Sequence, residues 1–265
     1  MFGQKLNPSW FFDSLMHQEA VSRLLYLVES RLNPGLITGP DGSGKTRVLL
    51  RVREELARTT TGTLHLSLSG LDSETALWQI ASGLCSGLKA ETNRREIMIR
   101  LRDEILGRSQ CRHQTVVLLD DMHRAVDDMS SILRLLMSFS EQSKGSLTII
   151  AASGRSFSAE LTEQCLVRVH LTPMDSAESC DFVRTLIRQT LKTSSVVEES
   201  AVRAIADFGM GNTARITRIC ELLRVVHEIS PDSRISEETV EAMVLELSPD
   251  ASRPRSAAPT LMRAS

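Results

Sequence analysis

The sequence predicts an α/β protein, in which a three-layer αβα core around a five-stranded parallel sheet precedes a small all-α domain. Three observations lead to this prediction. Short apolar runs alternate with longer segments of helical periodicity between about residues 20 and 172, and beyond Pro173 only helical periodicity remains. Two of the apolar runs are continuous rather than alternating. This pattern is typical of a parallel sheet whose strands are buried on both faces by helices.

Five short runs are predicted to form the strands. Those at 115–120 and 146–152 are continuously apolar, whereas 63–68 alternates between polar and apolar residues. The other two strands are predicted at 35–39 and 167–171. In four further segments of this region apolar residues recur at helical spacing, so helices are predicted at 17–30, 45–59, 72–84 and 94–106.

The chain is predicted to have four parts. A lead-in within residues 1–34 contributes a helix that packs on the core, and the core itself occupies 35–172. A helical domain follows at 173–248, and its four amphipathic helices are predicted at 175–191, 197–209, 214–226 and 236–247. The tail at 249–265 is rich in Pro, Ser, Ala and Arg without periodicity, and a segment of this composition is expected to be disordered.

The composition argues against some classes of function. A net charge of −2 gives no overall basic field that would attract nucleic acid or an anionic membrane. The five cysteines include no pair at C-x-x-C spacing, which favours free thiols in a reducing compartment over a zinc site or disulfides. No apolar run approaches the roughly 20 residues of a membrane-spanning helix. A cytoplasmic protein without a membrane span is therefore expected.

The segment "GPDGSGKT" at 39–46 fits the phosphate-loop pattern G-x-x-x-x-G-K-[ST], with an apolar run before it and a helical pattern leaving from Lys45. Its glycines allow successive backbone N–H groups to face an anion, and the helix N-terminus adds positive charge. Lys45 is expected to reach the β- and γ-phosphates of a nucleotide, and the Thr46 hydroxyl to bind Mg²⁺. Contacts with ATP are predicted for Gly39, Pro40, Asp41, Gly42, Ser43, Gly44, Lys45, Thr46 and Arg47.

Two aspartates follow the apolar run "TVVLL", and no guanine-reading N-K-x-D motif is present. In phosphate-loop proteins an aspartate at such a strand end holds the Mg²⁺ shell, so Asp120 is predicted to be a metal ligand together with Thr46. Asp121 is predicted to polarise the water that attacks the γ-phosphate, and the alternative is a merely polar neighbour of the metal ligand. Aspartate reaches about 1.5 Å less far than glutamate, so slow hydrolysis is expected.

Four segments, in order, resemble the AAA+ ATPases of the general secretion pathway protein A type: "LITGPDGSGKT", "VVLLDDMH", "LTIIAAS" and "GNTARITRIC". The resemblance covers about residues 8 to 248. It implies a five-stranded αβα phosphate-loop core and a helical lid, which here is the domain at 173–248. It also implies Mg-ATP as ligand and nucleotide-dependent assembly or remodelling of partners. Asp121 stands where this family usually has the glutamate of D-E-A-H or D-E-A-Q.

The same resemblance suggests roles for further residues. Ser153 occupies the place of the polar sensor of the γ-phosphate, and an ordinary strand-end serine is the alternative. The family's G-N-P-R is replaced by G-N-T-A-R, so the sensor arginine is predicted to be Arg215 or Arg218. Arg155 and Arg168 are candidates for a finger that reaches the phosphate of a neighbouring subunit, which would act only in a homo-oligomer.

Three functions remain open. The first is an ATPase that couples turnover to movement between core and lid, with catalysis assigned to Lys45, Asp121 and Ser153. The second is a switch that binds ATP with little turnover, which the short Asp121 favours. The third is a DNA-associated ATPase, because arginines are densest at Arg94, Arg95, Arg100, Arg102, Arg108 and Arg112, although Glu91, Glu96, Asp103 and Glu104 dilute them. The sequence indicates no particular protein partner.

Overall fold

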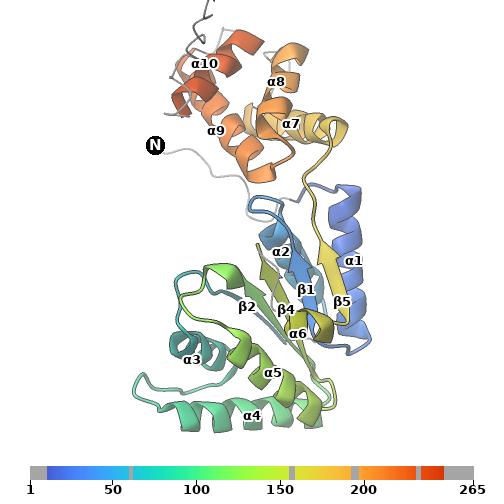
Figure 1. Cartoon of the computed structure of the whole chain (residues 1–265), viewed down its shortest axis with the longest axis vertical. Coiled ribbons are helices and arrows are strands. Elements are labelled where there is room, and N and C mark those ends of the chain that lie inside the picture. Colours follow the sequence, from blue (N-terminus) through green and yellow to red (C-terminus); the bar gives the residue numbers. More distant parts are fainter. Residues whose placement is uncertain (1–10, 60–61, 155–158, 192–196, 231–233, 248–265) are drawn as a thin grey trace, which may run out of the picture. The chain divides into compact units, whose positions relative to one another are not determined.

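The computed structural model describes residues 11–59, 62–154, 159–191, 197–230 and 234–247 (Figure 1). The chain separates between Pro173 and Met174 into two compact units. The beginning of the predicted lead-in, the predicted tail at 249–265 and the finger candidate Arg155 lie outside the described residues.

The first unit is built on a five-stranded, all-parallel sheet with the strand order β2-β3-β4-β1-β5, which confirms the predicted fold class. The strands are β1 (Gly35–Thr38), β2 (Gly62–Ser67), β3 (Thr115–Asp120), β4 (Leu147–Ser153) and β5 (Val167–His170). All five lie within one or two residues of the predicted runs. β3 and β4 are buried along their whole length, as their continuous apolar sequences require.

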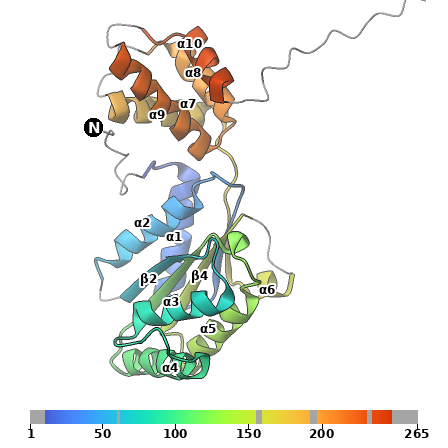
Figure 2. The ribbon, with the colours of Figure 1, turned by 90° about the vertical axis from the view of Figure 1, so that its left-hand side faces the viewer.

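Helices cover both faces of this sheet (Figures 1 and 2). Helices α1 (Leu15–Glu29) and α2 (Lys45–Leu56) form one hydrophobic cluster with residues that include Val116 and Leu118 of β3. The alternate residues of the same strand, Val117 and Leu119, belong to a second cluster. This second cluster involves α3 (Ser73–Leu84), α4 (Arg94–Gln110) and α5 (Ser130–Gln142). Successive side chains of a strand point to opposite faces, so β3 takes part in both clusters.

Three short or unexpected elements complete the first unit. Helices α5 and α6 (Ala159–Gln164) have no counterpart among the helices predicted from periodicity. A single 3₁₀ turn, η1 (Met122–Arg124), follows the acidic end of β3. Among the described residues no helix combines the length and the apolar character needed to cross a membrane.

The second unit contains four helices in its described part, as predicted: α7 (Ser176–Leu191), α8 (Glu199–Gly209), α9 (Thr213–Ile229) and α10 (Glu237–Leu247). Asp175 stabilises the start of α7, because its carboxylate accepts a hydrogen bond of 2.8 Å from the Glu178 amide. An isolated parallel bridge joins Val197 to Ile235.

The parallel strands of the first unit all deliver their last residues to one edge of the sheet. In the order of the strands these residues are Ser67, Asp120, Ser153, Thr38 and His170. The register pairs Ser67 with Asp120, and Thr38 with both Ser153 and His170. In open parallel sheets this edge is where ligands bind, and here it carries polar side chains on all five strands.

Candidate phosphate-binding site

Residues 39–46 connect β1 to α2 in a tight curve that depends on glycine. Gly44, the residue before the helix, has a φ of 95°, which an L side chain rarely adopts. A Cβ atom on Gly44 would lie 2.5 Å from Nε2 of His17, and one on Gly39 would lie 2.5 Å from the carbonyl oxygen of Leu171. Both approaches are closer than real contacts allow, so the loop needs glycine for conformation and for space.

Lys45 lies over the loop rather than in solvent, with only 6% of its surface exposed. Its ammonium donates hydrogen bonds of 2.8 Å to the Gly39 carbonyl and 2.9 Å to the Pro40 carbonyl. Burial lowers the pKa of Lys45 below its usual range, although the nearby carboxylates of Asp41 and Asp120 oppose this shift. The ammonium therefore stands beside the loop, where it would exchange two carbonyl contacts for phosphate oxygens.

Asp120, 2% exposed at the end of β3, lies beside the start of α2. One of its oxygens accepts a 2.8 Å hydrogen bond from the Asp121 amide, and the Thr46 hydroxyl lies near enough to the carboxylate to help lower its pKa. Nε2 of His65 lies 3.8 Å from the other oxygen, which is longer than a hydrogen bond. Burial raises the pKa of Asp120, but His65, Thr46 and the Asp121 amide together lower it below its ordinary value. Thr46 and Asp120 thus form an adjacent hydroxyl–carboxylate pair.

Asp121 has a left-handed backbone, with a φ of 53° and a ψ of 34°, and its side chain is 27% exposed. The Ser67 hydroxyl donates to Oδ2 of Asp121 at 3.5 Å, and Nε of Arg124 lies 3.9 Å from Oδ1. Aspartate tolerates the left-handed conformation better than most residues, because its short side chain can hydrogen-bond locally. The second acid of the pair is therefore partly open to solvent, while the first is enclosed.

Sequence comparison agrees with this geometry. A family model described as "AAA domain" matches residues 29–161, about half of the chain, and this stretch contains both the phosphate loop and the acidic strand end. The chain belongs to the AAA domain family. The resemblance stated from the sequence motifs is thereby confirmed at the level of the family.

One curated relative of this AAA domain is General secretion pathway protein A of Aeromonas hydrophila, which is 23% identical over 228 residues. The match covers 81% of this chain and 41% of the relative, so the chain spans less than half of that protein's length.

Solved structures with the same fold include Drosophila ORC bound to DNA, with a TM-score of 0.72, 16% identity and coverage of 92% of this chain and 63% of that one. Cdc6p from Pyrobaculum aerophilum has a TM-score of 0.69 at 14% identity, covering 86% of this chain and 66% of that one. The RuvB Holliday junction branch migration motor of Thermotoga maritima has a TM-score of 0.61 at 17% identity, with coverages of 89% and 69%. These likenesses establish the fold.

Two residues of this AAA domain that the sequence analysis did not single out, His123 and Arg124, hold the phosphate loop. Nδ1 of His123 accepts a 2.8 Å hydrogen bond from the Gly154 amide, so the ring proton belongs on Nε2, which lies 3.2 Å from Oδ1 of Asp41. Nη2 of Arg124 donates to the other oxygen of Asp41 at 2.9 Å. The 3₁₀ turn therefore contacts Asp41 of the loop through two side chains, and His123 also links it to Gly154 at the end of β4.

We expect Arg124→Ala to raise the pKa of Asp41. The hydrogen bond from Arg124 is the largest cause that holds the pKa of Asp41 below its ordinary value of 3.8. Its loss should raise the pKa of Asp41 toward 3.8. The measurement is a pH titration followed by NMR of the side-chain carboxyl. Arg58→Ala, which removes an exposed arginine paired with Glu55, is the control and should leave Asp41 unchanged. Identical titration of Asp41 in wild type and Arg124→Ala would contradict the contact.

The remaining sensor candidates occupy different places. Ser153 is buried at the end of β4, beside Thr38 in the sheet register. Arg168 is exposed on β5, and its Nε donates to the Cys165 carbonyl at 3.3 Å. Arg215 and Arg218 are both exposed near the start of α9, in the second unit. Their sensor and finger roles stay predictions.

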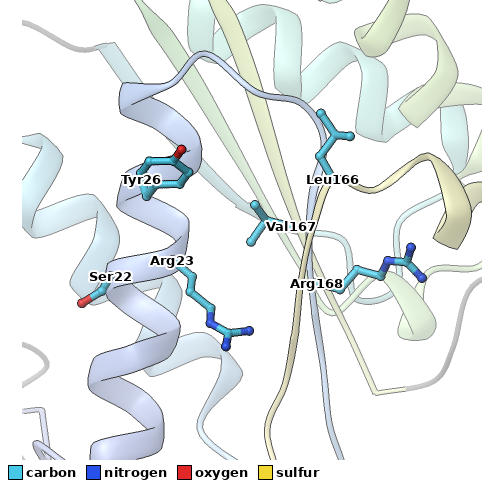
Figure 3. Close-up of a pocket in the computed structure, with 6 residues that line it drawn as sticks. All are labelled: Ser22, Arg23, Tyr26, Leu166, Val167 and Arg168. Atoms are coloured by element: carbon cyan, nitrogen blue, oxygen red, sulfur yellow. The ribbon is translucent and has the colours of Figure 1, made fainter.

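A cavity of about 450 Å³ lies between α1 and β5, away from the phosphate loop. Arg23 extends from α1 toward β5, whereas Arg168 extends away from α1 (Figure 3). The two arginines therefore do not converge on one anion. The cavity also borders the start of β5, while the phosphate loop follows the end of β1.

Carboxylates on the arginine-rich helix α4 neutralise part of its positive charge. Arg100 pairs with Glu96 at 2.7 Å, Arg102 with Asp103 at 2.9 Å, and Arg108 with Glu104 at 2.7 Å. Half of the six arginines that suggested a nucleic-acid surface thus have a carboxylate partner on the same helix.

Proposed function

We propose that this AAA domain binds Mg-ATP in the loop at 39–46 and hydrolyses it slowly. In this proposal the nucleotide state controls the assembly or remodelling of a protein partner. The observation that supports the proposal best is the adjacent pair of Thr46 and Asp120 at the end of the phosphate loop. Membership of the AAA domain family supports nucleotide binding and hydrolysis in general.

The residues present fit the metal and the phosphates. A hydroxyl and a carboxylate side by side are the hard oxygen ligands that Mg²⁺ prefers, so Thr46 and Asp120 would hold it. The buried Ser43 hydroxyl has no hydrogen-bond partner among the described residues, and a phosphate oxygen would satisfy it. When bound, the metal neutralises charge on the phosphates and orients them. Lys45 and the amides of the loop would bind the phosphate chain from the other side.

In this proposal Asp121 polarises the attacking water, with Ser153 and Lys45 near the γ-phosphate. The carboxylate of Asp121 is one methylene shorter than the usual glutamate, and general-base catalysis requires contact at about 2.6–3.2 Å. Because the Asp121 carboxylate reaches less far toward the attacking water, turnover is slow in this proposal. The second unit would act as the lid, and Arg215 or Arg218 would sense the nucleotide.

A second candidate is an ATP-dependent switch with little turnover, which the short side chain of Asp121 and its contact with Ser67 favour. In either case we propose a cytoplasmic protein that forms a homo-oligomer, since its five cysteines are free and arginine fingers act between subunits. A role at DNA has weaker support, because three of the arginines of α4 pair with carboxylates on the same helix.

The proposal is tested by measuring phosphate release from Mg-ATP at several protein concentrations. We expect turnover that stops in EDTA and exceeds that of Lys45→Ala, which lacks the ammonium over the loop. A rise in specific activity with concentration would support assembly. Binding of ATP without release above the Lys45→Ala background would favour the switch, and absence of binding would refute both candidates.

A further inference from the structure

His17 contacts the phosphate loop from a distant part of the chain. It lies in the first turn of α1 and is 5% exposed. Its Nε2 lies 2.9 Å from the carbonyl oxygen of Ser43, and its Nδ1 lies 2.6 Å from the hydroxyl of Ser14. The edge of the Phe11 ring packs near the imidazole, with ring centroids 6.0 Å apart and planes at 85°. The ring is therefore enclosed and has a hydrogen-bonding partner at each nitrogen.

These contacts determine where the ring proton lies. A carbonyl oxygen only accepts hydrogen bonds, so Nε2 of His17 must carry a proton to bind Ser43. The Ser14 oxygen also caps α1 by accepting a 3.2 Å hydrogen bond from the His17 amide. Its hydroxyl proton remains available for Nδ1, which is the acceptor in the neutral ring. The Ser43 carbonyl thus selects the tautomer, and the Ser14 hydroxyl can donate to the nitrogen that this tautomer leaves unprotonated.

The contact fixes the orientation of one peptide unit of the loop. In a trans peptide the C=O and the following N–H point in opposite directions. Because the Ser43 carbonyl points at His17, the Gly44 amide points away from it. Gly44 also lies directly against the ring, since a Cβ atom there would come within 2.5 Å of Nε2. Rotation of this peptide unit would break the contact with His17.

We propose that His17 is a positioning residue of the phosphate loop. Through the Ser43 carbonyl it aims the Gly44 amide at the phosphate chain, and the contact of Ser14 with Nδ1 holds the imidazole in place. The inference rests on the proposed binding of ATP at 39–46 and adds that the lead-in helix α1 determines how well the loop binds phosphate. Nucleotide affinity should therefore depend on a side chain that does not itself contact the nucleotide.

Two variants of His17 form a matched test. In His17→Gln the side-chain amide reaches about as far as Nε2, so it can still donate to the Ser43 carbonyl. In His17→Asn the amide reaches about as far as Nδ1, so it can contact Ser14 but not Ser43. We expect His17→Gln to bind ADP nearly as wild type does and His17→Asn to bind it about tenfold more weakly, which corresponds to about 1.4 kcal/mol.

The measurements are the dissociation constants of ADP and adenosine by calorimetry or competition NMR, together with the melting temperature of each variant. Adenosine lacks phosphates, so its affinity should be the same in both variants. Equal ADP affinities of the Gln and Asn variants, or parallel losses of ADP and adenosine binding, would overturn the inference. Failure of the wild type to bind ADP would instead refute the proposed nucleotide site, so the two failures are distinguishable.

Discussion

Asp120→Asn is expected to reduce magnesium-dependent phosphate release at least about a hundredfold, the loss typical when one preorganised electrostatic contact is removed from a reaction site. The side chain keeps its size, so the enclosed position at the end of β3 can accept it. The amide, however, carries no charge to hold Mg²⁺ beside Thr46. The measurement is the rate of phosphate release at saturating ATP, with the magnesium concentration varied.

Asp103→Asn is the control for this variant, because Asp103 is an exposed carboxylate on α4 that pairs with Arg102. It should leave the rate and its magnesium dependence unchanged. Phosphate release by Asp120→Asn at the wild-type rate would show that this carboxylate does not hold the metal.

Asp120→Asn should also change how the free energy of unfolding depends on pH in metal-free buffer. The folded-state pKa of Asp120 is lowered below 3.8, so its ionised form stabilises the folded protein above that pH. This stabilisation is lost as the pH falls from 3.8 through the folded-state pKa. The free energy of unfolding of the wild type should therefore fall more steeply in this range than that of Asp120→Asn.

Asp121→Glu is expected to raise the turnover number for Mg-ATP about ten- to a hundredfold, a part of the roughly hundredfold to ten-thousandfold that general-base catalysis contributes. The added methylene extends the carboxylate by about 1.5 Å from a backbone position that stays the same. The partly exposed side chain, with its 3.5 Å contact to Ser67, leaves room for the longer residue. The affinity for ATP should change little, because Asp121 is not expected to bind the phosphates.

Asp121→Asn is the matched comparison, since it keeps the length of the side chain and removes its charge. It should lower turnover below that of the wild type. An unchanged turnover number in Asp121→Glu would mean that chemistry at position 121 does not limit the reaction, and the switch with slow product release would then be favoured.

The sheet could be predicted closely from the sequence because each strand is a short, distinct apolar run. β3 shows the reason, since its four central residues, Val116 to Leu119, are all apolar and are buried alternately in two different clusters. Helix α5 has no predicted counterpart, although Ile132, Leu133, Leu136 and Phe139 recur at helical spacing, and its four serines weaken its helix propensity. The N-cap residue of α5, Met129, makes no side-chain cap hydrogen bond, so the sequence gives no capping residue to mark where the helix begins.

The parts of the site that could be predicted are those in which neighbouring residues form one motif, such as the loop at 39–46 and the pair Asp120 and Asp121. The contacts of His17 with Ser43 and of His123 with Asp41 join residues 26 and 82 positions apart. Such contacts exist only after the strands and helices pack, and single histidines carry no spacing that reveals them. The pair "HR", which follows the aspartates after one methionine, is a local sign of the second contact.

Positions in the sheet that tolerate substitution lie apart from positions where a substitution would affect the site. The apolar interiors of β3 and β4 supply packing, so their side chains can be exchanged for others of similar volume without reaching the chemistry. Each polar residue at the shared edge, by contrast, is joined by one peptide bond to a fully enclosed neighbour, as Asp120 is to Leu119. A substitution that changes the volume of the last enclosed residue of a strand would therefore displace a reactive group directly. The same change two residues earlier would leave that group in place.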